Sequence, residues 1–384
     1  MDRIRTTHAG SLPRPPRLRK MLAAAFAGEA VAAAELAEAS AAAARAVVKR
    51  QLEAGIDVVN NGEQGRESFF TYVQHRMSGF GGKSERAIMR DTVSYPGYRE
   101  RMVAASRGEH AINLMAAPRA IGEVRYTRPE LLAAECAELA AILHDLGAAP
   151  GDAFMSAPSP GIIAAAMTND YYPSMADYVD ALAEALRVEY ETIAGAGFTL
   201  QIDAPDLALE RHTSFADRPL GEFLDFVAMV VAAINKALTK APRERVRLHV
   251  CWGNYEGPHH LDVPLEDIYG EIIKIEAGAL MLSMANPRHA HEYHLFERRR
   301  LPEHMKLVVG VIDTTTNYIE HPLAVADRLE LAARALGDPS RIMAGTDCGF
   351  ETSSGVSFVA EDVAWAKLGS LCEGAGIASR KLFG

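Results

Sequence analysis

Apolar and polar positions alternate with a period of two in several short runs of this chain. In the clearest run, Val246, Leu248 and Val250 alternate with Arg247 and His249. This period is typical of a β-strand whose two faces have different surroundings. Longer stretches between such runs have apolar residues at helical spacing and are rich in Ala, Leu and Glu. The pattern therefore predicts strands and helices that alternate along the chain.

We predict nine strand candidates and a set of helices between them. The strand candidates are Ile4–Arg14, Ile56–Asn60, Ile121–Tyr126, Ala153–Ala157, Phe198–Asp206, Arg245–Gly253, Ala279–Met284, Leu307–Asp313 and Ile342–Cys348. The expected helices are Leu22–Leu52 in two segments, Phe69–Arg76, Pro129–Leu146, Met175–Ala196, Leu220–Thr239, Leu265–Ala277, His321–Leu336 and Val363–Ala378.

This alternation predicts an α/β protein with a parallel sheet and crossover helices. About eight repeats in one chain indicate a (β/α)8 TIM barrel. One strand candidate is then surplus, and we expect it to be Ile4–Arg14 or Ile121–Tyr126. No linker-like break divides the chain, so we expect one domain over residues 1–384.

The exception is an excursion over about residues 77–119, after the second strand, with paired glycines and charges of both signs. Loops of this length are often lids, and the alternative is a solvated insertion.

Composition excludes several classes of protein. The 384 residues carry a net charge of −10, which argues against a nucleic-acid partner. No apolar run approaches the length of a membrane span, and the N-terminus has no signal-peptide core. Four cysteines in a chain of this length do not form a disulfide framework, so we expect a cytoplasmic protein.

Polar residues follow the predicted strands at their ends. They are His8, Glu63, Asp203, Asp206, His249, Cys251, Asn286, Asp313, Asp347 and Cys348. In a barrel of parallel strands these positions share the C-terminal face, where TIM-barrel active sites lie.

His249 and Cys251 are two residues apart and therefore leave the same face of a strand. Imidazole and thiolate are both zinc ligands, and Cys348 offers a third donor after another strand. The alternative is that the cysteines are small buried apolar residues and that His249 is a hydrogen-bonded core residue.

Several ordered motifs together carry a resemblance to a known family. They are Thr6–Arg14, Asn61–Glu63, Gln201–Asp203, His249–Cys251, Asn286–His289, Asn317–Pro322 and Gly345–Phe350, which includes Asp347–Gly349. Thr6–Arg14, Asn61–Glu63, Gln201–Asp203, His249–Cys251 and Asp347–Gly349 resemble the catalytic C-terminal domain of cobalamin-independent methionine synthase. The whole chain is more closely similar to the short single-barrel relatives of that enzyme, which also carry versions of the other three motifs and include epoxyalkane:coenzyme M transferase.

The resemblance implies a Zn²⁺ site that binds a small thiol as its thiolate and makes it accept an alkyl group. A coordinated thiol is deprotonated, whereas a free thiol is mostly protonated at neutral pH. By this resemblance His249, Cys251 and Cys348 match the zinc ligands. Glu63 and Asp203 match the residues that hold the amino group of homocysteine, and Ala9–Ser11 matches the loop that holds its carboxylate.

We therefore assign candidate roles to two sets of residues. The candidate catalytic residues are Asp203, Glu63, Thr315 and Asp347. The candidate substrate-binding residues are His8, Gly10, Ser11, Glu63, Asp203, Asn286 and His289.

The chain departs from the synthase pattern at two positions. Aligning the strand after His249–Cys251 places Met284 where the synthases have a fourth zinc ligand, a glutamate. We therefore expect three protein ligands and an open coordination position, as in catalytic zinc sites. Thr315 stands where the synthases have a histidine, which His259, His289 or His291 would have to replace as a proton carrier.

The expected function is methyl or alkyl transfer to a small thiol, or the reverse C–S cleavage. One alternative is a metal-free barrel related to uroporphyrinogen decarboxylase that acts as a lyase or hydrolase. Another is a non-catalytic binder of a sulfur compound. We expect a thiol and an alkyl donor as small-molecule partners, no nucleic acid and no membrane. The oligomeric state, including a homo-oligomer, stays open.

Overall fold

A parallel seven-stranded sheet organises the chain in the computed structural model, which describes residues 3–105, 111–112 and 117–384. The strands are β1 (Arg5–Thr6), β4 (Phe154–Pro158), β5 (Thr199–Asp203), β6 (Val246–Val250), β7 (Ala279–Leu282), β8 (Lys306–Ile312) and β9 (Ile342–Thr346). Their order across the sheet is β1-β9-β8-β7-β6-β5-β4, and every neighbouring pair is parallel. The predicted α/β fold with parallel strands is confirmed.

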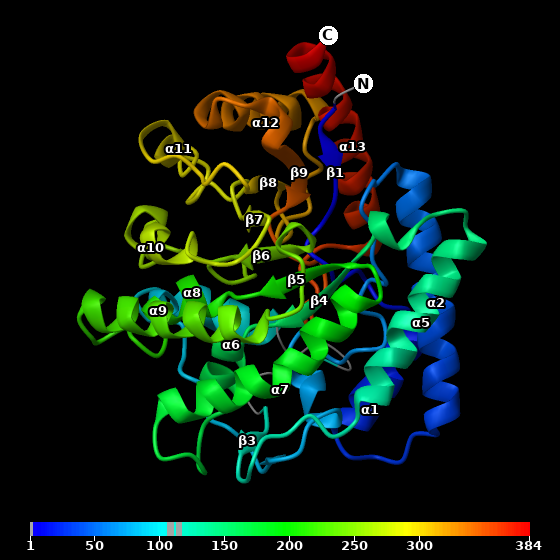
Figure 1. The fold of residues 1–384 in the computed structure, drawn as a ribbon, viewed down its shortest axis with the longest axis vertical. Coiled ribbons are helices and arrows are strands. Elements are labelled where there is room, and N and C mark those ends of the chain that lie inside the picture. Colours follow the sequence, from blue (N-terminus) through cyan, green and yellow to red (C-terminus); the bar gives the residue numbers. More distant parts are fainter. Residues whose placement is uncertain (1–2, 106–110, 113–116) are drawn as a thin grey trace.

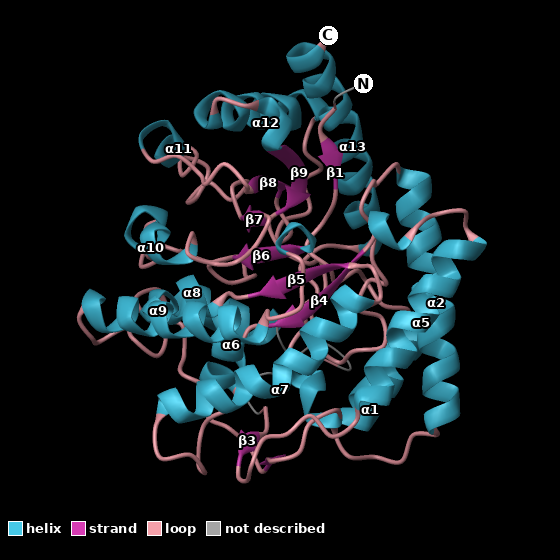
Figure 2. Ribbon diagram, in the orientation of Figure 1, coloured by secondary structure: helices cyan, strands magenta, loops and turns pink. Residues whose placement is uncertain are grey.

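Helices surround the curled sheet (Figures 1 and 2). They are α1 (Pro16–Phe26), α2 (Ala33–Ala54), α5 (Pro129–Asp145), α6 (Pro160–Ala166), α7 (Met175–Gly195), α8 (Asp206–Leu209), α9 (Leu220–Ala237), α10 (Leu265–Ile272), α11 (His294–Arg298), α12 (Pro322–Leu336) and α13 (Glu361–Phe383). Each long helix buries an apolar stripe against the sheet or a neighbouring helix. The helix expected over Phe69–Arg76 is only a 3₁₀ turn, Thr71–His75. No helix in the described ranges combines the length and apolarity that a membrane crossing needs.

The segment at residues 57–59 lies between the two edges of the sheet. Asp57 N and Val58 N donate to the carbonyl of Thr6 in β1, at 3.2 and 3.0 Å. On the other side, Phe154 N in β4 donates to the carbonyl of Val59 at 2.9 Å. The expected strand Ile56–Asn60 is thus a single parallel bridge between Val59 and Ala153, at the place of an eighth strand. Of the two surplus candidates, the opening run supplies β1, and Ile121–Tyr126 lies outside the main sheet.

The excursion after this segment contains short elements. An antiparallel pair, β2 (Phe80–Gly81) and β3 (Arg119–Ala120), brackets α3 (Arg90–Val93) and α4 (Pro96–Ala105). Residues 106–110 and 113–116 of the expected excursion lie outside the described residues. Arg86 forms an ion pair with Glu210 at 3.0 Å. Asp91 accepts hydrogen bonds from the Tyr255 hydroxyl and, at 3.0 Å, from His259 N. The described part of the excursion is therefore bonded to the loops that follow β5 and β6.

Candidate metal and thiol site

One cavity at the C-terminal ends of the strands collects half of the predicted site residues, including all three candidate metal ligands. It has a volume of about 210 Å³, and its lining includes Ser11, Glu63, Asp203, His249, Cys251 and Cys348. Arg86 and Met89 of the excursion also line it. The strand-end rule thus brings together side chains that are up to several hundred positions apart in sequence.

Three metal-binding side chains meet at the floor of this cavity. One donor atom from each of His249, Cys251 and Cys348 lies within 4.8 Å of the other two, and all three residues are buried. His249 is in β6 and Cys251 directly follows it, whereas Cys348 comes two residues after β9. One imidazole and two thiols in this arrangement match the donor types and number of a catalytic zinc site with an open fourth position.

Hydrogen bonds fix the orientation of the His249 ring. Its Nδ1 lies 2.8 Å from Asp203 Oδ1, and its Nε2 lies 3.1 Å from the carbonyl oxygen of Asp347. Burial disfavours the imidazolium, but the bond to Asp203 and the charge of Cys251 outweigh burial and raise the pKa of His249 to about 9. A metal ion at Nε2 would replace one proton and leave Nδ1–H on Asp203, the partner arrangement usual behind a metal-bound histidine.

Hydrogen bonds from Arg247 to Gln201 and from Gln201 to Asp203 hold the Asp203 carboxylate in place. Arg247 Nε donates to Gln201 Oε1 at 2.7 Å, and Gln201 Nε2 donates to Asp203 Oδ1 at 2.8 Å. The remaining Arg247 nitrogens donate to Thr7 Oγ1 and to the carbonyl of His8. Because a guanidinium can only donate, Gln201 must turn its carbonyl towards Arg247 and its amide nitrogen towards Asp203.

The two cysteines form a coupled pair. A hydrogen bond from the Cys348 thiol lowers the pKa of Cys251 to about 7, with help from the nearby His249 charge. The same bond, together with burial, raises the pKa of Cys348 well above its usual value. Of the two thiols, Cys251 is therefore the one that loses its proton more easily.

The strand pairing contradicts the alignment that places Met284 at the position of the fourth zinc ligand. Residues paired across parallel strands share a face, and His249 pairs with Met281, so Met281 and Ser283 point into the barrel. Met284 instead packs, with Leu280 and Leu282, in the large core between sheet and helices. Ser283 occupies the inward position, and its hydroxyl donates at 2.8 Å to the Asp347 carbonyl that His249 Nε2 also approaches.

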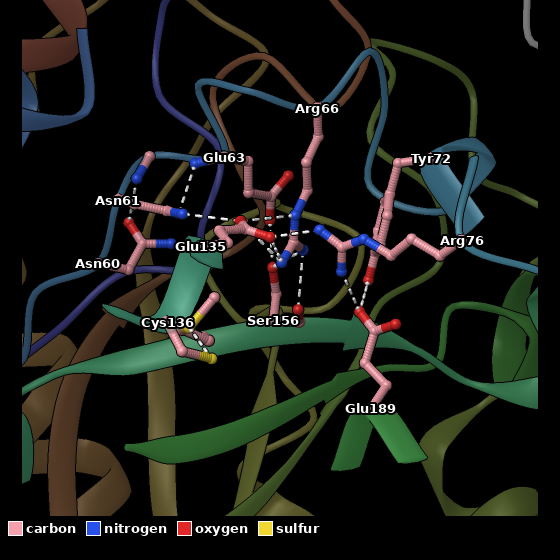
Figure 3. Close-up of polar contacts among 12 residues, drawn as sticks. Asn60, Asn61, Glu63, Arg66, Tyr72, Arg76, Glu135, Cys136, Ser156 and Glu189 are labelled. Carbon is pink, nitrogen blue, oxygen red and sulfur yellow. Dashed lines mark hydrogen bonds and ion pairs between the residues drawn. The ribbon is translucent and has the colours of Figure 1, made fainter. Parts of the chain in front are cut away.

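Glu63 presents an unsatisfied carboxylate to the cavity. Its Oε1 accepts a hydrogen bond from Ser156 Oγ at 2.6 Å, while its buried Oε2 has no hydrogen-bond partner in the described part of the chain. Arg66, the alternative ion-pair partner, instead bonds to Glu135 and to the Ser156 carbonyl (Figure 3). Burial and the nearby Asp203 charge raise the pKa of Glu63. Glu63 Oε2 can therefore accept a hydrogen bond from a cationic group of a substrate.

The loop before α1 contributes Ala9 and Ser11 to the cavity lining. The buried Oγ of Ser11 has no hydrogen-bond partner among residues 3–105, 111–112 and 117–384. Gly10 is required because a Cβ there would lie 2.6 Å from Glu63 Oε1. His8 does not line the cavity, contrary to expectation, since its ring nitrogens bond to Gln51 Oε1 and Gly10 N. Burial lowers its pKa to about 4, so it is a neutral support of this loop.

The other predicted residues border a smaller cavity next to Cys348. Its lining includes Asn286, His289, Thr315, Asp347 and Ser283. Thr315 bonds through its backbone nitrogen and its hydroxyl to Asp313 Oδ1. The Asp347 carboxylate accepts three backbone N–H groups, from Met284, Ala285 and Asn286. These contacts hold loops in place, and a catalytic role for Thr315 or Asp347 stays a prediction.

Sequence reasoning missed Arg247, Gln201 and Ser283. Gln201 and Arg247 lie two residues before Asp203 and His249, so the period of two could have placed both of them inside the barrel. Ser283 was missed because the face of its strand was assigned one residue out of phase.

Comparison with known proteins identifies relatives over the whole chain. A family model described as the catalytic domain of cobalamin-independent synthase matches residues 4–145. A methionine synthase of Sulfolobus acidocaldarius is 26% identical over 348 residues, covering 90% of this chain and 85% of that protein. A methionine synthase of Saccharolobus solfataricus is 24% identical, with coverage of 98% and 95%.

Solved structures share the fold. A B12-independent methionine synthase from Shewanella sp. W3-18-1, in complex with selenomethionine, superposes with a TM-score of 0.72 at 21% identity and covers 99% of both chains. A putative vitamin-B12-independent methionine synthase from Listeria monocytogenes has a TM-score of 0.62 at 19% identity, with coverage of 97% and 98%. The resemblance drawn from the motifs is thereby confirmed.

Proposed function

We propose that this chain, an enzyme of the cobalamin-independent methionine synthase-like family and of methyltransferase type, transfers a methyl or alkyl group to a thiol held at His249, Cys251 and Cys348. The observation that carries the proposal is the convergence of these three buried donors within 4.8 Å on the cavity floor. The same geometry serves the reverse reaction, C–S cleavage. A binder without a metal would not need two cysteines and a carboxylate-oriented imidazole at one point.

Zinc is the metal that the donor set fits best, and when bound it would keep a substrate thiol deprotonated at neutral pH. The residues of the chain then have separate tasks. Asp203 holds the proton of His249 on Nδ1, so that Nε2 keeps its lone pair for a metal ion. The cavity walls keep the reacting sulfur out of bulk water. The thiolate sulfur forms its new bond to the transferred carbon as the carbon–donor bond breaks, and that electron pair leaves with the donor.

The substrate class follows from the unsatisfied groups around the metal ligands. Glu63 Oε2 has no hydrogen-bond donor among the described residues, and burial together with the Asp203 charge raises the pKa of Glu63, so a cationic group beside it would be stabilising. Ser11 Oγ, also without a partner in the described residues, is a free hydroxyl for a carboxylate. We therefore propose an amino-acid thiol of the homocysteine type. We also propose that the chain is one (β/α)8 domain in which residues 57–59 take the place of the eighth strand.

The proposal is tested by metal analysis and a substrate screen. We expect zinc to co-purify, and cobalt in its place to show thiolate-to-cobalt absorption. Incubation with a panel of thiols and methyl donors, followed by mass spectrometry, should give a thioether from an amino-acid thiol. Protein that is folded but shows neither cobalt–thiolate absorption nor alkylated thiol would refute the proposal.

The corrected strand phase predicts opposite results for glutamate at two neighbouring positions. Ser283→Glu places a carboxylate beside His249 Nε2, so we expect zinc to leave more slowly and the thiol to bind more weakly. Met284→Glu buries an unpaired charge among apolar helices and should destabilise the fold by several kcal/mol. Zinc off-rates, thiol affinity and thermal unfolding should be measured on both variants. Equal behaviour of the two variants would show that the phase is wrong.

A further inference from the structure

A second group of metal-binding side chains lies outside the thiol site. His259 Nδ1 and His289 Nε2 are 2.8 and 2.7 Å from the same oxygen, Oδ2 of Asp262. The donor atoms of these three residues all lie within 4.8 Å of one another. All three side chains are at most 5% exposed. Solvent therefore does not satisfy this cluster, unlike a chance group of surface acids.

The outer nitrogen of one ring has a partner of the kind found behind metal-bound histidines. His259 Nε2 lies 3.0 Å from the carbonyl oxygen of Tyr255. The other ring stacks on Trp252, and its outer nitrogen, His289 Nδ1, has no hydrogen-bond partner among the described residues, with Glu292 Oε1 3.7 Å away. Both rings direct their other nitrogen inward to Asp262.

A fourth residue gives independent support. His212 follows β5 in the chain, and its side chain is 2% exposed. Neither of its ring nitrogens has a hydrogen-bond partner in the described ranges, and the same holds for Asp262 Oδ1. His212 Nδ1 lies 3.3 Å from that oxygen. Buried polar atoms are rarely left without partners, so these three atoms together point to a missing ligand.

The backbone at His259 has an unfavourable conformation. His259 has a φ of 52°, in the left-handed region, and its N–H is held by Asp91 Oδ2. Such a conformation in a non-glycine residue persists where its surroundings enforce it, commonly at functional sites. The excursion residue Asp91 therefore fixes the ligand-bearing loop after β6.

We propose that His259, Asp262 and His289 bind a second divalent transition-metal ion, with His212 beside the open side of Asp262. Two imidazoles and one carboxylate are nitrogen and oxygen donors, which suit Zn²⁺, Fe²⁺, Mn²⁺ or Ni²⁺ and differ from the sulfur-rich first site. The ion joins the loops that follow β6 and β7, and the segment after β5 brings His212 next to it. His259 and His289 also line the small cavity that Cys348 borders. The second ion thereby shapes the wall next to the thiol site.

The test uses full-length protein in which the first site is disabled. Cys251→Ser/Cys348→Ser removes both thiols and leaves the second cluster intact. After chelation, reloading with Zn²⁺ or Co²⁺ and desalting, we expect about one metal ion per chain, with X-ray absorption showing only nitrogen and oxygen neighbours. Adding Asp262→Asn should weaken zinc binding more than about 100-fold, beyond the loss caused by removing a partner behind a ligand.

The outcomes separate the two sites. A folded double-cysteine variant that retains no metal and shows no thermal shift with zinc would overturn the proposal, whatever the first site does. If Asp262→Asn does not fold, His289→Asn in the same background replaces it, and the metal content of the parent variant remains decisive. In the wild-type background, Asp262→Asn should keep the thiolate-to-cobalt absorption of the first site.

Discussion

Replacing Cys251 or Cys348 with serine should abolish thiolate-to-cobalt absorption or reduce it to a weak remnant, and should lower the methyl-transfer rate at least 100-fold. The loss of a partner behind a ligand already costs 10- to 100-fold, and the loss of a ligand costs more. Both thiols lie in the buried cluster with His249, and no other cysteine borders the cavity in the described residues. Cobalt spectra and product formation should be measured together.

Two cysteines elsewhere in the chain are matched controls. Cys136 lies against Met155, and Cys372 is partly exposed near Thr6. Cys136→Ser and Cys372→Ser should keep the cobalt spectrum and the activity. If Cys251→Ser retained both, the cavity floor would not be the metal site, and the proposed chemistry would fall with it.

Glu63→Gln should weaken binding of an amino-acid thiol by about 10- to 100-fold, the value of one charge-assisted hydrogen bond. A thiol of similar size without an amine should lose little, because Glu63 is not one of the three candidate metal ligands. Glu38→Gln, on the exposed surface of α2, is the control. Equal losses for the two thiols would argue against Glu63 as the amine site.

Binding should also depend on pH in a definite direction. Burial raises the pKa of Glu63 in the free protein, and an ammonium group beside it would lower that pKa. Binding of the amine-bearing thiol therefore releases a proton when the pH is below the raised pKa, so its affinity falls as the pH falls through that range. Glu63→Gln removes this part of the pH dependence, which calorimetry in buffers of different ionisation enthalpy would show.

The sequence predicted that His249, Cys251 and Cys348 would meet, because their positions follow a simple rule. His249 and Cys251 share a strand face, and Cys348 follows another parallel strand, so the topology brings them to one place. The same alternation failed for Met284 because both faces of β7 are apolar. Leu280 and Leu282 pack towards the helices while Met281 packs inside the barrel, so hydrophobicity did not distinguish the faces.

The second cluster was beyond sequence reasoning for a different reason. His212, His259, Asp262 and His289 lie on three loops with no common period. His259 was considered only as a substitute for the missing histidine at Thr315, and His289 also as a substrate-binding residue, but neither as a metal ligand. Their meeting depends on loop conformations, such as the left-handed backbone at His259, that no pattern of hydrophobic positions encodes.

Arg247 donates a hydrogen bond to Gln201, and Gln201 donates one to Asp203. Because each bond in this series has only one possible direction, we expect the candidate metal site to be sensitive to substitutions of residues that do not contact the substrate. Gln201→Glu would set one carboxylate against another, and Arg247→Leu would leave the Gln201 carbonyl without its donor. Either change would weaken the hold on Asp203, which orients the His249 ring. In a deep mutational scan selected for methyl transfer, these two positions should tolerate as few replacements as the metal ligands. Selection would thus identify Gln201 and Arg247 as essential, although neither of them lines the cavity.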